Sequence, residues 1–304
     1  MHWRRRGHLF APDGSASWMR HHAANPFAVH ESDDVFRVYF SARDDDNRSH
    51  IGFVKLELNE AARIAAVADR PVLSPGAPGY FDDSGVSMGS IAKVGRRTLL
   101  YYLGWNLGVT VPFRNTIGAA ELDAGGISAE RVSRAPVLDR SAHDPLSMSY
   151  PYVIETAGKY EMFYGSTTNY GSGKSTEEMT HVVKRAESSD GVEWRTFPSP
   201  CIDVHSADEL GISRPTVLRD SSGYRMWYSY RSRSGPYRIG YAESANGQTW
   251  DRKDRAVAWT GEAEEWESDM QCYCHVFRHR GTLHMLYCGN GYGKTGFGLA
   301  TLVP

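Results

Sequence analysis

The chain has 304 residues, a formal net charge of −2 and a sequence pI near 6.6, so it has no basic excess with which to bind nucleic-acid phosphates or an anionic membrane. The first residues lack the apolar stretch of a signal peptide, and no later segment approaches the length of a membrane span. We therefore expect a cytoplasmic protein with no nucleic-acid partner and no membrane insertion, whose oligomeric state the sequence leaves open.

One pattern recurs along the chain: a short apolar run, a polar turn, and an aromatic-rich run that ends near a tyrosine. These tyrosines are Tyr39, Tyr102, Tyr164, Tyr228 and Tyr287. In four copies an anchor residue precedes the tyrosine by thirteen positions, and the second copy, Met88 to Tyr102, is looser. The anchors are Pro26, Pro151, Pro215 and Cys274. Strand-like units repeated about every sixty residues are typical of a β-propeller. We predict an all-β, five-bladed β-propeller that forms a single domain over residues 1–304.

The strands of the first copy are expected over 26–29, 35–40 and 50–58. The fourth copy repeats this order over 215–218, 224–230 and 237–244. Gly and Asp in the intervening turns accept backbone angles that β-branched residues resist. The last copy ends with a strand over 297–303 and has no residues left for an outer strand. We predict that residues 3–10 supply that strand and close the propeller, which removes an exposed sheet edge.

Three strand ends of each copy meet at one rim of the predicted propeller. In an antiparallel blade the first strand starts, the second ends and the third starts on the same side. The loops on this side carry polar, aromatic and cationic side chains suited to a small-molecule sugar or sugar phosphate. The candidate binding residues are Asn25, Arg43, Asp44, Trp105, Asn106, Arg114, Tyr150, His181, Arg214, Arg231, Arg238 and Lys294.

The arginines of this set indicate an anionic ligand, because a planar guanidinium group binds a carboxylate or phosphate through two hydrogen bonds. Some of them are expected to form ion pairs within the chain instead, for example Arg43 with the acids of 44–46. Trp105, Asn106 and Tyr150 offer an apolar ring face and hydrogen bonds, both of which a sugar pocket needs. Trp105 as a core residue is the alternative.

Converging carboxylates could act as the general acid and general base of glycosidic-bond cleavage. Asp83 and Asp269 are the first candidates, because each lies five residues before the start of the corresponding repeat, at Met88 or Cys274. Asp144 is the third candidate. The alternative, equally weighted for any one of them, is that such an Asp accepts backbone amide hydrogens in a turn.

No cofactor and no metal are expected. Cys201, Cys272, Cys274 and Cys288 suit reduced thiols, and the spacing of Cys272, Cys274 and His275 matches no zinc template. The glycines 291, 293 and 296 match a nucleotide-binding pattern, but no helix follows to receive a pyrophosphate. This segment is interpreted as a loop at the mouth of the channel.

The dipeptides Asn25-Pro26, Tyr150-Pro151 and Arg214-Pro215, each followed by a Tyr-rich strand, resemble the five-bladed propeller glycosidases. This superfamily includes glycoside hydrolase families 32, 43, 68 and 130. Over nearly its full length the chain also resembles uncharacterised glycosidase-like proteins of bacterial surface-polysaccharide loci. The segments that carry this second likeness are 37–41, 81–86, 104–110 and 211–215.

The resemblance implies the propeller fold and a glycosidase type of activity, but the site residues differ from family to family. The family 43 pattern implies acids at the channel ends of the first strands of blades one to three. This chain has Asn25 in blade one, and Ser149 and Tyr150 in blade three. Family 130 implies one carboxylic acid and a cationic site for an attacking phosphate, and the arginine-rich rim resembles that arrangement more closely.

The resulting hypothesis is a carbohydrate-active enzyme that makes or breaks a glycosidic bond of an anionic or phosphate-bearing sugar, as a glycoside hydrolase or phosphorylase. Asp83 or Asp269 would donate the proton, and the arginines would hold the anion. Three alternatives stay open, because a fold hosts unrelated functions. They are a propeller glycosyltransferase with an activated sugar donor, a non-catalytic sugar-binding module and a scaffold for protein contacts.

Overall fold

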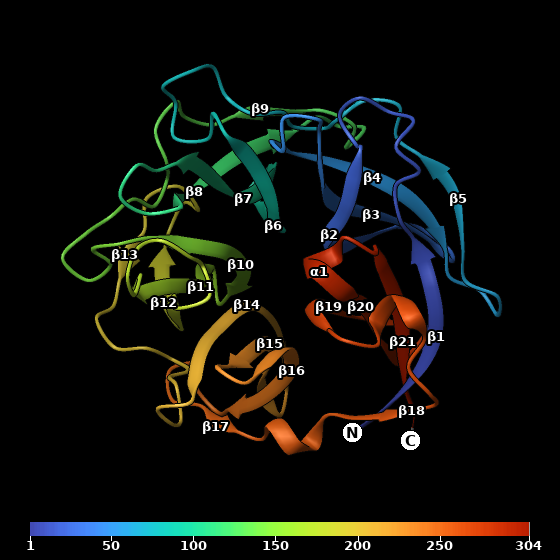
Figure 1. The fold of residues 1–304 in the computed structure, drawn as a ribbon. Helices are drawn as coiled ribbons and strands as arrows, with labels where there is room; N and C mark the ends of the chain where they lie inside the picture. The colour runs from blue at the N-terminus through green and yellow to red at the C-terminus, as the bar shows by residue number, and fades with distance from the viewer. Residues whose placement is uncertain (304) are drawn as a thin grey trace.

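The computed structural model describes residues 1–303, and strands form nearly all of its regular structure (Figure 1). The predicted all-β class is therefore confirmed. The chain contains two short 3-10 helices, Asp254–Ala256 and Glu265–Glu267, and a four-residue helix α1 (Asn290–Gly293). Within residues 1–303, no helix is both long and apolar enough to span a bilayer.

Strands that follow one another in sequence pair antiparallel in four consecutive units. The first unit is β2 (His21–Ser32), β3 (Val35–Arg43), β4 (Ser49–Glu57) and β5 (Arg63–Val67). The second is β6 (Gly85–Val94), β7 (Arg97–Leu107), β8 (Phe113–Leu122) and β9 (Ala129–Arg131). The third is β10 (Met148–Thr156), β11 (Lys159–Asn169), β12 (Thr180–Ser188) and β13 (Arg195–Thr196). The fourth is β14 (Glu209–Asp220), β15 (Gly223–Ser232), β16 (Gly235–Ser244) and β17 (Asp251–Arg252).

The last sheet joins both ends of the chain. It contains β19 (Cys272–His279), β20 (Thr282–Cys288), β21 (Phe297–Val303), β1 (His2–Phe10) and β18 (Ala258–Thr260). Strand β1 pairs antiparallel with β21, from His2 opposite Val303 to Phe10 opposite Phe297. The N-terminal strand thus lies beside the C-terminal strand, as Figure 1 shows.

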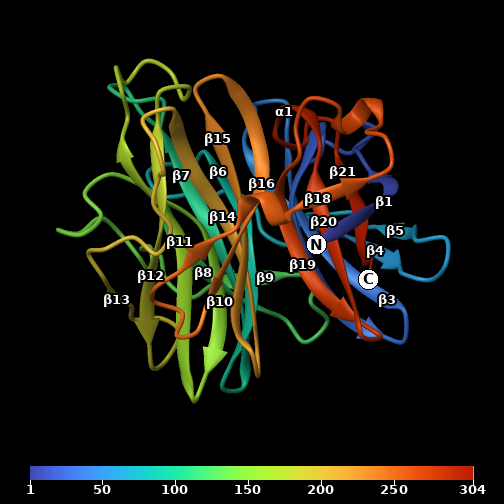
Figure 2. The same ribbon diagram turned by 90° about the horizontal axis from the view of Figure 1, so that it is seen from below.

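The innermost strands of the units surround a common axis (Figure 1). Strand β2 contacts β6, β6 contacts β10, β10 contacts β14, β14 contacts β19, and β19 returns to β2. One end of this ring carries α1 and the β7–β8 and β11–β12 connections, at the top of Figure 2, and the polar cavity described below opens at that end.

The recurrent tyrosines have a structural role. In the second, third and fourth units and in the last sheet, the buried hydroxyl donates a hydrogen bond to a carboxylate that is itself paired with a cation, so the hydroxyl group has a partner within the fold. These sets are Tyr102–Asp82–Arg131, Tyr164–Asp144–Lys184, Tyr228–Asp254–Arg252 and Tyr287–Glu267–Arg5. In the first unit, Tyr39 donates instead to the carbonyl of Gly126, at 2.8 Å. We call the four sets the tyrosine–carboxylate staples.

A repeated irregularity turns the innermost strands toward the axis. Asn25, Tyr150, Arg214 and Tyr273 have φ values of 56°, 47°, 54° and 53°, a left-handed conformation that is rare and costly for residues other than glycine. Each directly precedes an anchor residue and lies at a register shift, and such bulges re-aim side chains.

In the second unit the shift falls at Gly89, which lies thirteen residues before Tyr102. A Cβ there would lie 2.5 Å from the carbonyl oxygen of Tyr101 and 2.7 Å from Cγ of Pro151, so only glycine fits. Gly89, rather than Met88, is therefore the counterpart of the anchors, and this explains why the second copy looked looser in sequence.

Candidate functional site

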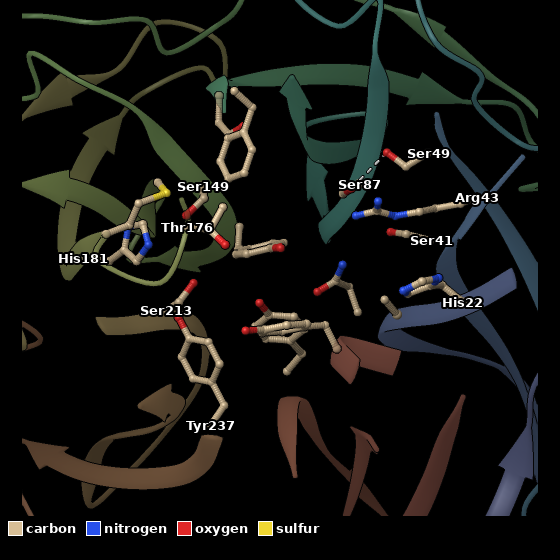
Figure 3. Close-up of a pocket in the computed structure, with 18 of the residues that line it drawn as sticks. His22, Ser41, Arg43, Ser49, Ser87, Ser149, Thr176, His181, Ser213 and Tyr237 are labelled. Atoms are coloured by element: carbon tan, nitrogen blue, oxygen red, sulfur yellow. Dashed lines mark hydrogen bonds between the residues drawn. The ribbon is translucent and has the colours of Figure 1, made fainter. Parts of the chain in front are cut away.

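A cavity of about 270 Å³ opens between the polar ends of the innermost strands (Figure 3). Its hydroxyl groups come from Ser41, Ser49, Ser87, Ser149, Thr176 and Ser213. Its rings and amides come from His22, Phe113, Tyr150, His181, Tyr237, Tyr273, Tyr292, Asn25 and Asn115. Arg43, Arg231, Ala24 and Met179 complete the lining. No Asp or Glu lines this cavity within residues 1–303, so its fixed charges are positive.

Neither arginine of the lining pairs with a carboxylate within residues 1–303. Arg43 donates a hydrogen bond to Oδ1 of Asn47, at 2.8 Å, and burial lowers its pKa. Arg231 donates to the carbonyl oxygens of Thr176 and Met179, at 2.8 and 3.1 Å. Guanidinium groups that lack carboxylate partners in a partly enclosed site favour an anionic ligand.

A third guanidinium group lies beneath the cavity and crosses the axis. Arg214 is fully buried and donates to the carbonyl oxygens of Gly89 at 2.6 Å and of Asn25 at 3.2 Å. Its Nε has no partner within residues 1–303. Burial lowers the pKa of Arg214, yet an arginine stays protonated in proteins. The floor of the cavity therefore carries a positive charge that no nearby carboxylate neutralises.

The two imidazoles of the lining are neutral at pH 7. Burial, together with Arg43, lowers the pKa of His22 to about 4, and burial, together with Arg231, lowers that of His181 to about 4. Nδ1 of His181 lies 3.1 Å from the Thr167 hydroxyl. A neutral imidazole can accept a hydrogen bond from a hydroxyl group of a ligand.

Tyrosines form one wall of the cavity. The ring of Tyr273 lies 5.2 Å from that of Tyr150, 5.8 Å from Tyr237 and 6.1 Å from Tyr292, measured between centroids. Burial raises the pKa of each of these phenols, so they remain protonated hydrogen-bond donors. Nearby Arg214 and Arg43 act against that increase at Tyr150. The wall offers apolar ring faces and hydroxyl groups, the combination that a sugar needs.

Asn25 is 3% exposed, and its Oδ1 has no hydrogen-bond partner within residues 1–303. An unpaired buried polar atom is costly, and it often marks a place that a ligand or water occupies. Asn25 lines the cavity together with His22 and Arg43. It is therefore well placed to bind a ligand hydroxyl.

The structure brings together five of the predicted binding residues and separates the others. Those in the cavity are Asn25, Arg43, Tyr150, His181 and Arg231. Arg214 lies below it, and Trp105 lies behind it and donates from Nε1 to the Ser49 hydroxyl at 2.8 Å. Those outside the lining are Asp44, Asn106, Arg114, Arg238 and Lys294.

Local bonds explain why several of the outer residues do not reach the cavity. Asp44 accepts hydrogen bonds from the Arg48 guanidinium and from Nε2 of His50, both at 3.1 Å. Asn106 donates to Oδ1 of Asp83, and Arg238 donates to the carbonyl oxygen of Asp269, at 2.6 Å in each case. The contacts of Asn106 and Arg238 join separate loops, so the sequence could not predict them, whereas Asp44 and Arg48 lie in one loop.

The three predicted catalytic acids also lie outside the lining. Asp144 is 1% exposed and belongs to a tyrosine–carboxylate staple, where it also accepts from the Ser166 hydroxyl at 2.6 Å. Asp83 accepts from the backbone N–H of Gly79 and the hydroxyl of Ser84, which is turn chemistry. Asp269 is exposed on the loop before β19.

Several lining residues were not in the predicted set. Three of them are serines that lie two positions before an anchor or its counterpart: Ser87 before Gly89, Ser149 before Pro151 and Ser213 before Pro215. A fourth, Tyr273, directly precedes the anchor Cys274. The anchor alignment therefore contained the signal for Ser149, Ser213 and Tyr273, and it also contained the signal for Ser87 once the second copy is aligned on Gly89. The positions of Tyr237 and Tyr292 depend on how separate units face each other.

The chain was compared with known proteins. No family model matches it. It is 47% identical over 302 residues to the uncharacterised Mycobacterium tuberculosis proteins Rv1502, of strain H37Rv, and MT1551, of strain CDC 1551, with 99% of each chain covered.

Solved structures share the fold at low sequence identity. A glycoside hydrolase superposes with a TM-score of 0.75 at 16% identity, covering 99% of this chain and 91% of the other. A member of the GH130 family of mannoside phosphorylases superposes with a TM-score of 0.73 at 14% sequence identity, covering 99% of this chain and 94% of the other. A thermostable family-43 glycoside hydrolase superposes with a TM-score of 0.60 at 15% sequence identity, covering 92% of this chain and 87% of the other. These likenesses establish the fold.

Proposed function

The chain belongs to the family of the mycobacterial protein Rv1502 and has the fold of the glycoside hydrolase propellers, and from this premise we propose that it is a carbohydrate-active enzyme acting on an anionic or phosphate-bearing sugar. The observation that carries the proposal is the lining of the central cavity. Two arginines without carboxylate partners, neutral imidazoles, hydroxyl groups and a tyrosine wall surround one volume of about 270 Å³.

The fold is interpreted as five blades around a channel. The four antiparallel units and the sheet of β19, β20, β21 and β1 would be the blades, and the β1–β21 pairing would close the ring. Under this interpretation the cavity is the polar mouth of the channel, where propellers generally bind ligands.

The anion is proposed to bind between Arg43 and the floor above Arg214. The sugar ring would then lie against Tyr150 and Tyr273, receive hydrogen bonds from Ser149 and Ser213, and donate one from a hydroxyl group to Oδ1 of Asn25. Arg231 is already bonded to the carbonyls of Thr176 and Met179, so it positions the β11–β12 connection rather than the anion. A partly dry, preorganised site of this kind strengthens each charge-assisted contact.

The reaction that fits this lining is glycosyl transfer to or from phosphate, rather than hydrolysis by two carboxylates. An attacking phosphate needs cations to hold it, and it needs no carboxylate base. A phosphate oxygen bonds to the anomeric carbon as the glycosidic C–O bond breaks. The leaving oxygen takes the proton of the Tyr150 phenol, and solvent reprotonates the phenolate. Burial raises the pKa of the Tyr150 phenol, and the hydrogen bond with Tyr273 and the charges of Arg214 and Arg43 partly offset that increase, since nearby positive charge favours an ionised acid. For Asp83 or Asp269 to donate the proton instead, their loops would have to close over the cavity.

Calorimetric titration and a turnover assay test the proposal. The ligands are hexose 1-phosphates, hexuronates and inorganic phosphate, and the assay follows phosphate release from each hexose 1-phosphate with free sugars as acceptors. Arg43→Gln should weaken anion binding at least tenfold, whereas Arg63→Gln, on the outer strand β5, should not. Tyr150→Phe should retain binding and lose on the order of 10² or more in turnover. If none of these anions binds, or if Arg43→Gln binds them as well as the parent protein, the proposal is wrong.

A non-catalytic sugar-binding module is the second candidate. The lack of a carboxylate in the lining within residues 1–303 favours it, because most glycoside hydrolases use two such groups. In that case Arg43→Gln would still weaken binding, but no combination of donor and acceptor would turn over. Tyr150→Phe would then be indistinguishable from the parent protein, because it retains binding and there is no turnover to lose.

A further inference from the structure

The most exposed of the large apolar side chains of residues 1–303 lie at the end of β7 and in the β7–β8 connection. Val109 is 104% exposed and Leu107 is 75% exposed, whereas Val67 and Ile127, on other parts of the surface, are each 41% exposed. Single exposed apolar residues are ordinary, but two at such high exposure in one short loop are less so. The proposed cavity chemistry gives these two side chains no role.

The loop is built to hold its apolar tip in place. The N–H of Gly108 donates to the carbonyl oxygen of Pro112 at 3.2 Å, which closes the turn, and the N–H of Leu107 donates to the Ser84 hydroxyl at 3.1 Å. The β11–β12 connection braces the other side, where a Cβ on Gly173 would lie 2.7 Å from the carbonyl oxygen of Thr110. The two connections extend together above the sheet ends in Figure 2. The exposure of Val109 therefore belongs to a defined turn.

The apolar tip is continuous with the cavity. Leu107 lies directly opposite Phe113 across the β7–β8 hairpin, and Phe113 lines the cavity. Directly opposed residues project from the same face of a hairpin, close enough to touch. Phe113 and Leu107 therefore share one face of the hairpin, and Val109 lies two residues beyond Leu107 in the exposed turn. We call these three residues the mouth strip.

The cations available to a ligand on the mouth strip are those of the cavity. Arg114 follows Phe113 at the start of β8, and successive side chains of a strand project from opposite faces, so Arg114 is not part of the strip. The cavity itself contains cations and no carboxylate, as described above. A ligand that matches both parts carries a negative charge on a sugar-sized head and an apolar chain attached to it.

We propose that the mouth strip binds an aliphatic chain that is covalently attached to the anionic sugar or phosphate held in the cavity, so that the natural ligand is an amphiphilic glycoside or glycosyl phosphate. The proposal deepens, and rests on, the anion-binding function proposed above. The chain would leave the cavity past Phe113 and lie along Leu107 and Val109. Each methylene that it buries should raise affinity roughly fourfold.

The test compares soluble probes of different chain length, each below its micelle concentration. Ethyl and octyl phosphate form one pair, and methyl and octyl β-glucoside form the uncharged pair. Burial of three further methylenes predicts that octyl phosphate binds roughly 60-fold more tightly than ethyl phosphate. Leu107→Ser with Val109→Ser should reduce that ratio to below about fivefold and leave ethyl phosphate binding unchanged. Val67→Ser with Ile127→Ser is the matched control and should retain the full ratio.

The arms separate failure of this inference from failure of the proposed function. Suppose that ethyl phosphate does not bind, but octyl β-glucoside binds more tightly than methyl β-glucoside, and that this difference disappears in the mouth-strip variant. The proposed anion site is then wrong, and the proposed binding of an aliphatic chain by the strip is supported. If octyl and ethyl phosphate bind equally, the strip binds no chain and the inference is wrong. The inference is also wrong if the mouth-strip variant keeps the full ratio of octyl to ethyl phosphate affinity but loses another property of the parent protein. That property would be self-association, measured by sedimentation velocity, or binding to anionic vesicles, measured by flotation.

Discussion

Asp144 offers the sharpest test of whether a sequence-predicted catalytic acid is instead part of the scaffold. Its carboxylate lies 2.9 Å from the Tyr164 hydroxyl, 2.6 Å from the Ser166 hydroxyl and 3.3 Å from Nζ of Lys184, and both members of this ion pair are buried. Asp144→Asn keeps an acceptor for the hydroxyl groups but leaves the ammonium group of Lys184 without its counter-charge.

Breaking a buried ion pair by removing one partner costs about 3–5 kcal/mol. For a domain of this size, each kcal/mol shifts Tm by about 2 °C, so the variant should unfold roughly 6–10 °C below the parent protein. Thermal unfolding followed by circular dichroism measures this shift. Adding Lys184→Met removes the unpaired charge and should recover about half of the loss.

The binding assay provides the second arm of this test. Because Asp144 does not line the cavity, Asp144→Asn should bind inorganic phosphate within about twofold of the parent protein at a temperature where both are folded. An unchanged Tm combined with lost turnover or lost anion binding would refute the structural role and restore the catalytic one.

Three further predictions concern the scaffold around the cavity. Burial lowers the pKa of His22 and of His181 to about 4, well below the usual 6.5, so these histidines bind protons in the unfolded chain at a higher pH than in the folded protein. The stability of the fold should therefore decrease as the pH falls from about 6.5 to 4. In a series of Tm measurements against pH, His181→Gln should show a smaller decrease than the parent protein. Gly89→Ala should lower the free energy of unfolding by about 1–3 kcal/mol in urea titration, whereas Gly235→Ala, with a nearest neighbour at 3.6 Å, should change it by less than about 1 kcal/mol. Trp3→Ala should lower the free energy of unfolding by about 3–5 kcal/mol, since Trp3 is fully buried against Trp227. If the variant is as stable as the parent protein in the same titration, β1 does not have the structural importance described above.

The sequence predicted the strands well, because the repeated units carry local signals. Alternating apolar runs and Gly- or Asp-containing turns specify hairpins, and the runs around Tyr39 and Tyr228 correspond to β3 and β15. The prediction that residues 3–10 pair with 297–303 followed from counting strands, and β1 lies there. These inferences depend on neighbours along the chain, which a single sequence contains.

The site was predicted less completely, because it depends on contacts between units. Strand polarity correctly placed Arg43 and Tyr150 at one end of the molecule. It could not reveal that Arg238 is held by the carbonyl of Asp269, or that Asp144 is buried beneath Tyr164. A loop residue's final direction is set by partners that are distant in sequence, and these partners are not part of the repeat.

The same physics accounts for the positive cavity in a chain whose net charge is −2. A buried tyrosine hydroxyl is stable only with an acceptor, and a buried carboxylate is stable only with a cation, so each staple keeps its acid within a unit and away from the axis. The acids held in this way are Asp82, Asp144, Asp254 and Glu267. The arginines at the axis bond to carbonyl and amide oxygens instead, which satisfies their hydrogens without neutralising their charge. Charge separation between the staples and the axis is therefore a property of the repeated scaffold, and the positive cavity that it leaves supports the anionic ligand that we propose.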